Sequence, residues 1–277
     1  MTKRTQIFIK NKLIAMGEMQ SYTLPKAPIS KIIISGVETT ACATALTVNE
    51  LFDWIKIRIN GKEFIDIGGE SEASKVPYGI ALWREFYKQK HKGVAMPDNQ
   101  WIIELPDALP IEAQVDLIFK VKTEAHSKCS DSALVYHIDI IFELDDKLKG
   151  KVVVPFVMCQ RFNIGTGTGH QYHYVPALPY KLRAVVMLSE DNGTIEANLG
   201  DDINDVTIKS PLKSYFDGMT NDLKIAHEGK SGVSLTAGYF IFNFKGGIKV
   251  APNSLLFDFF VDTAGTNTTI HFLYICY

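Results

Sequence analysis

The sequence predicts an all-β chain that consists of two similar antiparallel units. Residues 25–28 carry a proline at each end and precede the apolar stretch 29–35, and the same arrangement returns at residues 176–179 before residues 180–188. Proline fixes φ and has no amide hydrogen for a sheet ladder, so each pair marks where the chain enters a strand from outside the sheet. The predicted elements also follow the same order twice, and strands do not alternate with helices as in a parallel α/β fold. The duplication therefore indicates two equivalent domains.

The length and the composition fit two globular domains. The chain has 277 residues, of which 46% are hydrophobic and 22% are charged, and such a composition is typical of a folded protein without long disordered tails. Two units of roughly 140 residues would each be large enough to bury a core. The stretch at residues 145–151 is charged and contains a glycine. We therefore predict an N-terminal domain at residues 1–148 and a C-terminal domain at residues 149–277.

The charge of the chain argues against direct nucleic-acid binding. The formal net charge is −2 and basic residues are interspersed with acidic ones, whereas a nucleic-acid binder carries a basic face. The first dozen residues differ, because they contain four basic residues and no acidic one: Lys3, Arg4, Lys10 and Lys12. Two interpretations stay open, a solvated terminus or a segment that faces an anionic surface such as lipid headgroups.

Neither a secretory signal nor a membrane-spanning segment is predicted. Residues 6–16 form no long apolar core after the basic start, and no apolar run reaches the length of a membrane span. We therefore expect a soluble protein that is synthesised in the cytoplasm. The cysteines are scattered without a Cys-x-x-Cys pair, so we expect reduced thiols rather than a zinc site or a disulfide framework. They are Cys42, Cys129, Cys159 and Cys276.

The first half begins with strands and a hairpin. Residues 6–15 and 31–35 are predicted strands. Residues 54–59 alternate large apolar with basic side chains, which is the period-2 pattern of a half-buried strand. Asn60-Gly61 follows, and because a type I′ turn needs positive φ at both central positions, this pair predicts a tight hairpin with residues 62–67 as the return strand.

A helix and three strands complete the first half. Pro77 stands at the predicted helix start, where a missing amide hydrogen is tolerated. Apolar residues then recur at helical spacing: Ile80, Leu82, Trp83, Phe86 and Tyr87. Residues 101–105, 115–121 and 133–144 are the remaining predicted strands.

The second half repeats these elements. We expect residues 165–169 to form a loop, and residues 194–198 and 206–209 to pair with each other. Ser210 is the predicted N-cap of a short helix that has Pro211 at its first position and reaches Phe216. The other predicted strands are residues 152–162, 180–188, 239–244, 254–261 and 268–277.

Each half therefore contains about eight strands, a number that favours the jelly roll, in which a double sheet protects its edges. An immunoglobulin-type sandwich is the competing fold, but the helix falls inside the unit and no Cys-Trp-Cys pattern is present. We predict two tandem eight-stranded antiparallel jelly rolls, each with a short helix in a mid-domain loop.

Few residue patterns suggest chemistry. Residues 165–169 alternate glycine with threonine, but no predicted helix follows to supply the amide donors of a phosphate site. His170 and His173 are three positions apart, which in a strand directs their side chains to opposite faces and argues against a metal site with His271. No Gly-x-Ser-x-Gly elbow is present. We predict no catalytic, cofactor-binding or metal-binding residues, and no enzymatic activity.

Acidic residues in predicted turns leave one alternative open. Glu190-Asp191, and Asp201-Asp202 with Asp205, could supply oxygen ligands to calcium. Carboxylates in turns are also common because aspartate bonds to its own backbone, and such groups are only solvated. We expect no cofactor, with a structural calcium ion as the alternative.

Several segments in both halves carry a family resemblance. They are Leu24-Pro25, Ser35-Gly36-Val37, residues 55–59 followed by Asn60-Gly61-Lys62, and Leu178-Pro179 followed by the strand through Val185. With the tandem duplication, these segments resemble double jelly-roll major capsid proteins, in particular those of icosahedral internal-membrane bacteriophages of the PM2-like corticovirus type. The resemblance spans the whole chain.

The resemblance implies a structural role in a virion. Proteins of this family form homotrimers whose six barrels give a pseudo-hexagonal capsomer, and their barrel bases face an internal lipid membrane. The implied partners are neighbouring capsomers and the penton, minor capsid or membrane proteins of the virion. The helices at residues 77–87 and 211–216 are expected either at the trimer interface or on the flank of their own barrel. The basic N-terminus fits the membrane side.

The alternative function is carbohydrate binding by a β-sandwich, such as a phage spike or a cupin-like enzyme accessory module. Sugar sites present exposed aromatic side chains on one face of a sheet, and Trp83 and Trp101 could be misread as such a site. The two functions differ in assembly, because a capsid protein forms trimers whereas a binding module binds glycans as a discrete unit.

Overall fold

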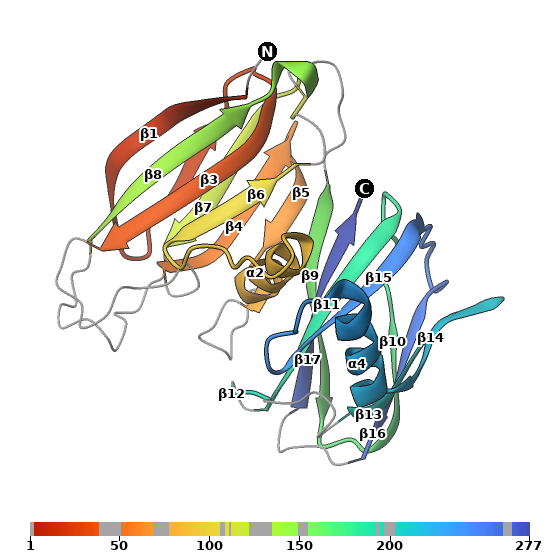
Figure 1. Cartoon of the computed structure of the whole chain (residues 1–277). Coiled ribbons are helices and arrows are strands. Elements are labelled where there is room, and N and C mark those ends of the chain that lie inside the picture. The colour runs from red at the N-terminus through yellow and green to blue at the C-terminus, as the bar shows by residue number, and fades with distance from the viewer. Residues whose placement is uncertain are drawn as a thin grey trace. The chain divides into compact units, whose positions relative to one another are not determined.

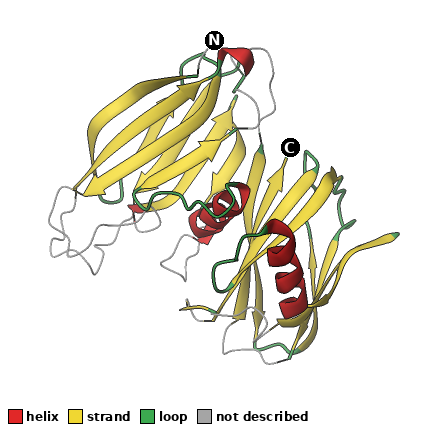
Figure 2. Cartoon of the chain, viewed as in Figure 1, coloured by secondary structure: helices red, strands yellow, loops and turns green. Residues whose placement is uncertain are grey.

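The computed structural model consists mostly of strands in two compact units, with α2 (Tyr78–Lys90) and α4 (Thr220–Ser231) as helices of several turns (Figure 1, Figure 2). It describes residues 3–38, 51–68, 78–105, 109–110, 112–121, 135–148, 155–191, 194–196, 203–262 and 268–277.

The first unit is a sandwich of two antiparallel layers. In one layer β1, β8, β3 and β6 are neighbours in that order, and in the other the order is β2, β7, β4 and β5. The strands are β1 (Arg4–Ala15), β2 (Met19–Thr23), β3 (Ile29–Glu38), β4 (Phe52–Ile59), β5 (Lys62–Ile67), β6 (Gln100–Glu104), β7 (Val115–Val121) and β8 (Val135–Leu144), with the short 3-10 helix η1 (Asp146–Leu148) after β8.

The second unit repeats this topology strand for strand. In one layer β9, β17, β11 and β15 are neighbours in that order, and in the other the order is β10, β16, β13 and β14. The strands are β9 (Phe156–Gly165), β10 (Gly169–Tyr174), β11 (Leu182–Asp191), β12 (Thr194–Ile195), β13 (Ile203–Ser210), β14 (Lys213–Met219), β15 (Tyr239–Ile248), β16 (Leu256–Val261) and β17 (Thr268–Cys276). The predicted fold of two tandem jelly rolls is confirmed, with β12 as a small addition.

The core of each unit lies between its two layers, because every second side chain of a strand points inward. In the first unit Ile32 and Ile34 of β3 and Phe119 of β7 are fully buried. The second unit is richer in aromatic rings, since Phe257 and Phe259 of β16 lie beside Phe272 of β17. Burial of each such side chain contributes roughly 1.5–3 kcal/mol.

The hairpin predicted from Asn60-Gly61 is present. Asn60 has a φ of 49° and Gly61 a φ of 79°, and Ile59 pairs with Lys62 across the turn. Asn tolerates this left-handed region better than most residues and Gly adopts it freely, so the local sequence is sufficient to specify the turn.

The helix predicted at residues 210–216 is wrong. Ser210 ends β13, and residues 213–219 form β14, which pairs with β13. Phe216 packs edge-on against Phe242 and Phe244, 5.0 and 5.4 Å between ring centroids, so sheet pairing and core packing outweigh the Ser-Pro helix signal. The helix of this half is α4, which follows β14. Only Thr220 of α4 is buried, so the sequence of α4 has little of the apolar periodicity from which a helix is predicted.

The predicted pairing of residues 194–198 with 206–209 is also wrong. β12 pairs with the end of β11, where Ile195 lies opposite Glu190. β13 pairs instead with β14 and β16. A strand pairing between distant segments depends on the whole sandwich, which nearest-neighbour turn signals do not encode.

The units do not follow the order of the chain completely. Residues 81–95, which include most of α2, group with the second unit although they precede β6 of the first. The boundary predicted between residues 148 and 149 stays a prediction, because residues 149–154 lie outside the described part. Cys159 and Cys276 are free thiols, and burial raises the pKa of Cys276 to about 12; Cys42 and Cys129 lie outside the described residues.

Candidate functional site

The histidines of β10 point to opposite faces, as predicted. His170 is exposed and His173 is buried in the core of the second unit. The ring of His173 stacks on Phe272 with 4.6 Å between centroids, and its Nε2 lies 2.8 Å from the hydroxyl of Tyr274. Burial lowers the pKa of His173 to about 4, so at neutral pH it is an uncharged aromatic component of the core.

His271 has a separate partner. Its Nε2 lies 2.9 Å from Oε1 of Glu190, and both side chains are nearly buried. Glu190 and Asp191 lie in β11 rather than in the predicted turn, because the ladder with β17 continues to Asp191. Asp205 likewise lies in β13.

The described residues do not assemble a metal centre from these acids and histidines. Among them, no group of three His, Cys, Asp or Glu side chains is placed to hold a metal ion. Asp201 and Asp202, the remaining members of the candidate calcium cluster, lie outside the described residues.

The outer face of the β10 layer carries charged and aromatic side chains. Asp258 Oδ1 lies 2.8 Å from His170 Nδ1, and its Oδ2 accepts from Lys209 Nζ at 3.0 Å. Burial alone would raise the pKa of Asp258, but the hydrogen bonds from His170 and Lys209 hold it below its ordinary value. Tyr172 and Tyr174 are 53% and 52% exposed, so this face presents aromatic rings beside a charged group.

The tryptophans considered for sugar binding are not surface residues. Trp83 of α2 and Trp101 of β6 are both buried, so they do not form an exposed aromatic face for a sugar. The exposed aromatic residues of the second unit include Tyr172 and Tyr174 instead. Their placement at alternate positions of one strand was available from the sequence, because such residues share a face.

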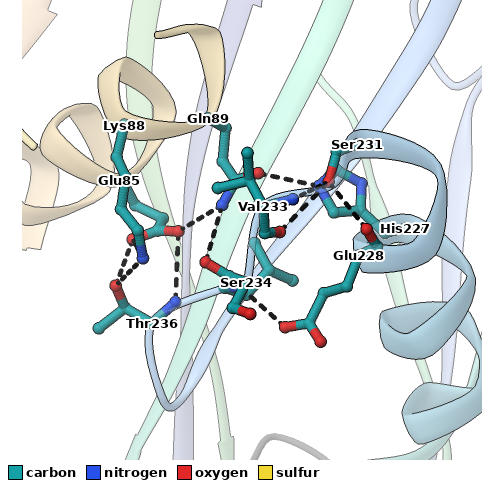
Figure 3. A network of polar contacts seen from close by, with 10 residues as sticks. Glu85, Lys88, Gln89, His227, Glu228, Ser231, Val233, Ser234 and Thr236 are labelled. Carbon is teal, nitrogen blue, oxygen red and sulfur yellow. Dashed lines mark hydrogen bonds and ion pairs between the residues drawn. The ribbon is translucent and has the colours of Figure 1, made fainter. Parts of the chain in front are cut away.

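A polar network binds α2 to the segment between α4 and β15 (Figure 3). The buried carboxylate of Glu85 accepts from the amide of Thr236 at 3.3 Å and from its hydroxyl at 2.5 Å. Gln89 Nε2 donates to the carbonyl of Ser234 at 3.2 Å and to Glu85 Oε1 at 3.0 Å. Hydrogen bonds to a charged acceptor are worth more than neutral ones, so Glu85 holds α2 in the second unit.

The network continues onto α4. His227 Nε2 lies 3.3 Å from Gln89 Oε1, and Glu228 Oε1 accepts from the amide of Leu235 at 2.7 Å. Burial lowers the pKa of His227, which favours its neutral form. α2 from residue 81 onward therefore belongs to the second unit, and neither expectation for this helix included that arrangement.

A cavity of about 430 Å³ lies between α4 and strands β14 and β15. Its wall is mainly apolar, with Phe216, Leu223 and Phe242 among the lining residues, and Lys230 is among its polar ones. The side chains of α4 thus do not fill the space between this helix and the strands, and the apolar side chains that line the cavity remain accessible.

The basic N-terminal residues are all on the surface. Lys3, Arg4, Lys10 and Lys12 are exposed, and the last three lie in β1. Arg4 makes one long ion pair, with 3.8 Å to Asp146, and exposed pairs of this kind contribute little to stability. No described helix has the length and apolar character needed to cross a membrane.

The strand order, repeated in both units, defines the fold as a double jelly roll. No protein-family model and no curated protein sequence matches the chain. Solved structures match it along nearly its whole length. The crystal structure of the STIV MCP, from Sulfolobus turreted icosahedral virus, is 15% identical, covers 99% of this chain and 96% of its own, and has a TM-score of 0.71.

Two further capsid structures are similar to the chain. The PBCV-1 virus capsid is 10% identical over 100% of this chain and 94% of its own, with a TM-score of 0.66. The major capsid protein P2 from bacteriophage PM2 is 10% identical over 99% of this chain and 97% of its own, with a TM-score of 0.65. The chain therefore has the fold of the double jelly-roll major capsid proteins, and the resemblance seen in the sequence is confirmed at this level. These neighbours are structural proteins and not enzymes.

Proposed function

We propose that this chain is a structural major capsid protein of an icosahedral virus. The observation that carries the proposal is the strand-for-strand duplication of one jelly roll within a chain that matches capsid proteins along its length. A shell is built from repeated similar contacts, and two equivalent barrels per chain double the number of such contacts that one gene product supplies. The chain would act in the virion without catalysis.

The proposed assembly is a homotrimer with six barrels. Three chains with two similar domains each give six similar sides, which can tile a surface as a pseudo-hexagonal capsomer. Neighbouring capsomers and the penton, minor capsid or membrane proteins of the virion are the proposed partners.

The trimer is tested by light scattering of the purified chain, followed by electron microscopy of the same sample. We expect a mass of three times the 30.9 kDa of one chain and particles with a hexagonal outline. A strict monomer at high concentration would contradict the capsomer.

We further propose that the basic N-terminal segment, residues 3–12, faces an internal membrane. Its four exposed basic side chains can each contribute about 1 kcal/mol to binding at an anionic surface. The test is flotation with liposomes that contain anionic lipid, with neutral liposomes as a reference. Replacement of Lys3, Arg4, Lys10 and Lys12 by Ser should abolish flotation, and unchanged flotation would contradict the proposal.

A control variant separates the position of these charges from their number. It replaces four other exposed lysines by Ser and so has the same net charge: Lys62, Lys92, Lys213 and Lys249. This variant should float like the wild-type chain.

Glycan binding is the second candidate function, and the exposed pair Tyr172 and Tyr174 favours it. Their rings lie on one face of β10 beside the charged side chain of Asp258, and exposed rings beside polar groups are what sugars pack against. A glycan screen with the wild-type chain and with Tyr172→Ala tests it. Binding that Tyr172→Ala loses, by a chain that remains monomeric, would favour this function over the capsid role.

A further inference from the structure

Helix α2 ends three residues before Gly93, and helix α4 ends directly before Gly232. Each is followed by a glycine with positive φ, 92° at Gly93 and 69° at Gly232, and each glycine lies seven residues before the first residue of the next strand, β6 or β15. A valine follows each glycine, Val94 in the first half and Val233 in the second. Counted from the strand that follows, the two glycines therefore occupy equivalent positions of the duplicated jelly roll.

The equivalence extends to the segment after each valine. Four residues before the next strand stands a buried apolar side chain, Met96 in the first half and Leu235 in the second. Because these anchors correspond, the two segments can be compared residue by residue.

The surroundings of the two helix ends differ sharply. Val233 is 6% exposed, and a Cβ built at Gly93 would lie 3.8 Å from its Cγ1. The end of α2 therefore rests on Val233. Val94, at the matching position, is 64% exposed, and no atom of the described residues lies within 4 Å of a Cβ built at Gly232.

A side chain in the middle of α4 is also more exposed than its equivalent in α2. Ile225 stands seven residues before Gly232 and is 68% exposed, whereas Phe86, seven residues before Gly93, is half-buried. Among the described residues, one helix-end contact is thus complete, and the two halves of an equivalent contact do not meet each other.

We propose that the end of α4 at Gly232 packs on Val94 of a second copy of this chain, as the end of α2 at Gly93 packs on Val233. The partner copy supplies the half that the described residues of this chain do not. Such a contact joins different surfaces of the two copies, so its repetition must either close a ring or continue as a filament. The proposal rests on the capsomer proposed above, in which three copies close the ring, and names the residues of its interface.

The proposed contact is apolar. Glu85 and Thr236 hydrogen-bond within the chain, but Lys224 and Pro97 stand at the equivalent positions of the second contact. Proline has no amide hydrogen and lysine accepts no hydrogen bond. Burial of Val94 and Ile225 must therefore supply the stabilisation that the polar network supplies around α2.

Cysteine pairs test the contact directly in the full chain. The variant Val94→Cys with Gly232→Cys should form disulfide-linked oligomers on mild oxidation, seen as ladders on non-reducing gels, whereas each single variant should not. The pair Gly93→Cys with Val233→Cys is the matched control, because it places the same two residue types at the equivalent positions and should yield only an internal disulfide. If the first pair gives no more covalent oligomer than the single variants while the wild-type chain is a trimer, the contact is wrong and the capsomer stands.

A charge substitution provides an independent measurement. Val94→Asp should lower the mass from three chains to one, because it buries an unpaired carboxylate in the contact. Leu212→Asp is the control, since Leu212 is 99% exposed and has no place in the proposed contact, and it should leave the mass unchanged. A Val94→Asp chain that remains trimeric overturns the inference, and a wild-type chain that is monomeric overturns both the contact and the capsomer.

Discussion

Protonation of His173 should destabilise the protein below pH 6.5. Burial lowers the pKa of this side chain from 6.5 to about 4 in the folded state. Between these values the unfolded chain binds a proton that the folded chain does not, so the free energy of unfolding falls as the pH falls. The full pKa difference corresponds to about 3 kcal/mol, of which about 2 kcal/mol is lost between pH 7 and pH 5.

The assay compares urea unfolding at pH 7 and pH 5 for the wild-type chain and for His173→Phe with Tyr274→Phe. The double substitution removes the ionisable ring together with the hydroxyl 2.8 Å from it, so no buried polar group is left without its partner. All samples have one protein concentration, because self-association changes apparent stability. The double variant should lose about 2 kcal/mol less than the wild-type chain between the two pH values.

Tyr274→Phe alone keeps His173 and should retain the pH dependence of the wild-type chain. If the double variant has the same pH dependence as the wild-type chain, the buried histidine is not the source of acid sensitivity and the reasoning is refuted.

Three further predictions concern glycines, the helix network and metal binding. Gly61 and Gly238 share a φ of 79°, but only a Cβ at Gly238 would overlap a backbone carbonyl. In thermal unfolding, Gly61→Ala should lower the free energy of unfolding by about 1 kcal/mol, and Gly238→Ala should lower it clearly more. Equal losses for the two variants would contradict this difference in packing. Thr236→Val removes a donor to the buried carboxylate of Glu85 and should cost about 1–3 kcal/mol, whereas Thr207→Val at an exposed bond should cost less. Calorimetric titration with calcium should give no heat, because the buried carboxylates of β11 and β16 already have histidine or lysine partners; saturable heat would restore the structural calcium ion.

Several features of the fold could be predicted from the sequence because they depend on neighbouring residues. Asn60-Gly61 specifies its turn through the φ values that these residues tolerate. The opposite faces of His170 and His173 follow from the two-residue period of a strand. The proline pairs before β3 and β11 mark strand entry through a missing amide hydrogen. Repetition of such local signals in one order was sufficient to predict two jelly rolls.

Other features depend on segments that are distant in the chain. Trp83 and Trp101 are aromatic residues in any context, but only packing decides that both are buried rather than exposed to a ligand. The sequence at Ser210 predicted a helix, but the residues that follow form β14 and pair with β13. α4 has almost no buried face, so no periodic apolar pattern predicts it. The grouping of residues 81–95 with the second unit is likewise set by contacts with residues more than a hundred positions away.

The architecture of two equivalent sandwiches, each entered through a proline corner, could be predicted from the sequence, because backbone dihedral preference and side-chain period act over a few residues. Which surfaces are covered could not be predicted in this way, because it depends on the packing of distant segments. Val94 and Val233 follow equivalent glycines in the sequence, yet one is exposed and the other buried. Burial depends on what packs against a residue, and for Val94 that partner is absent from the described part of its own chain.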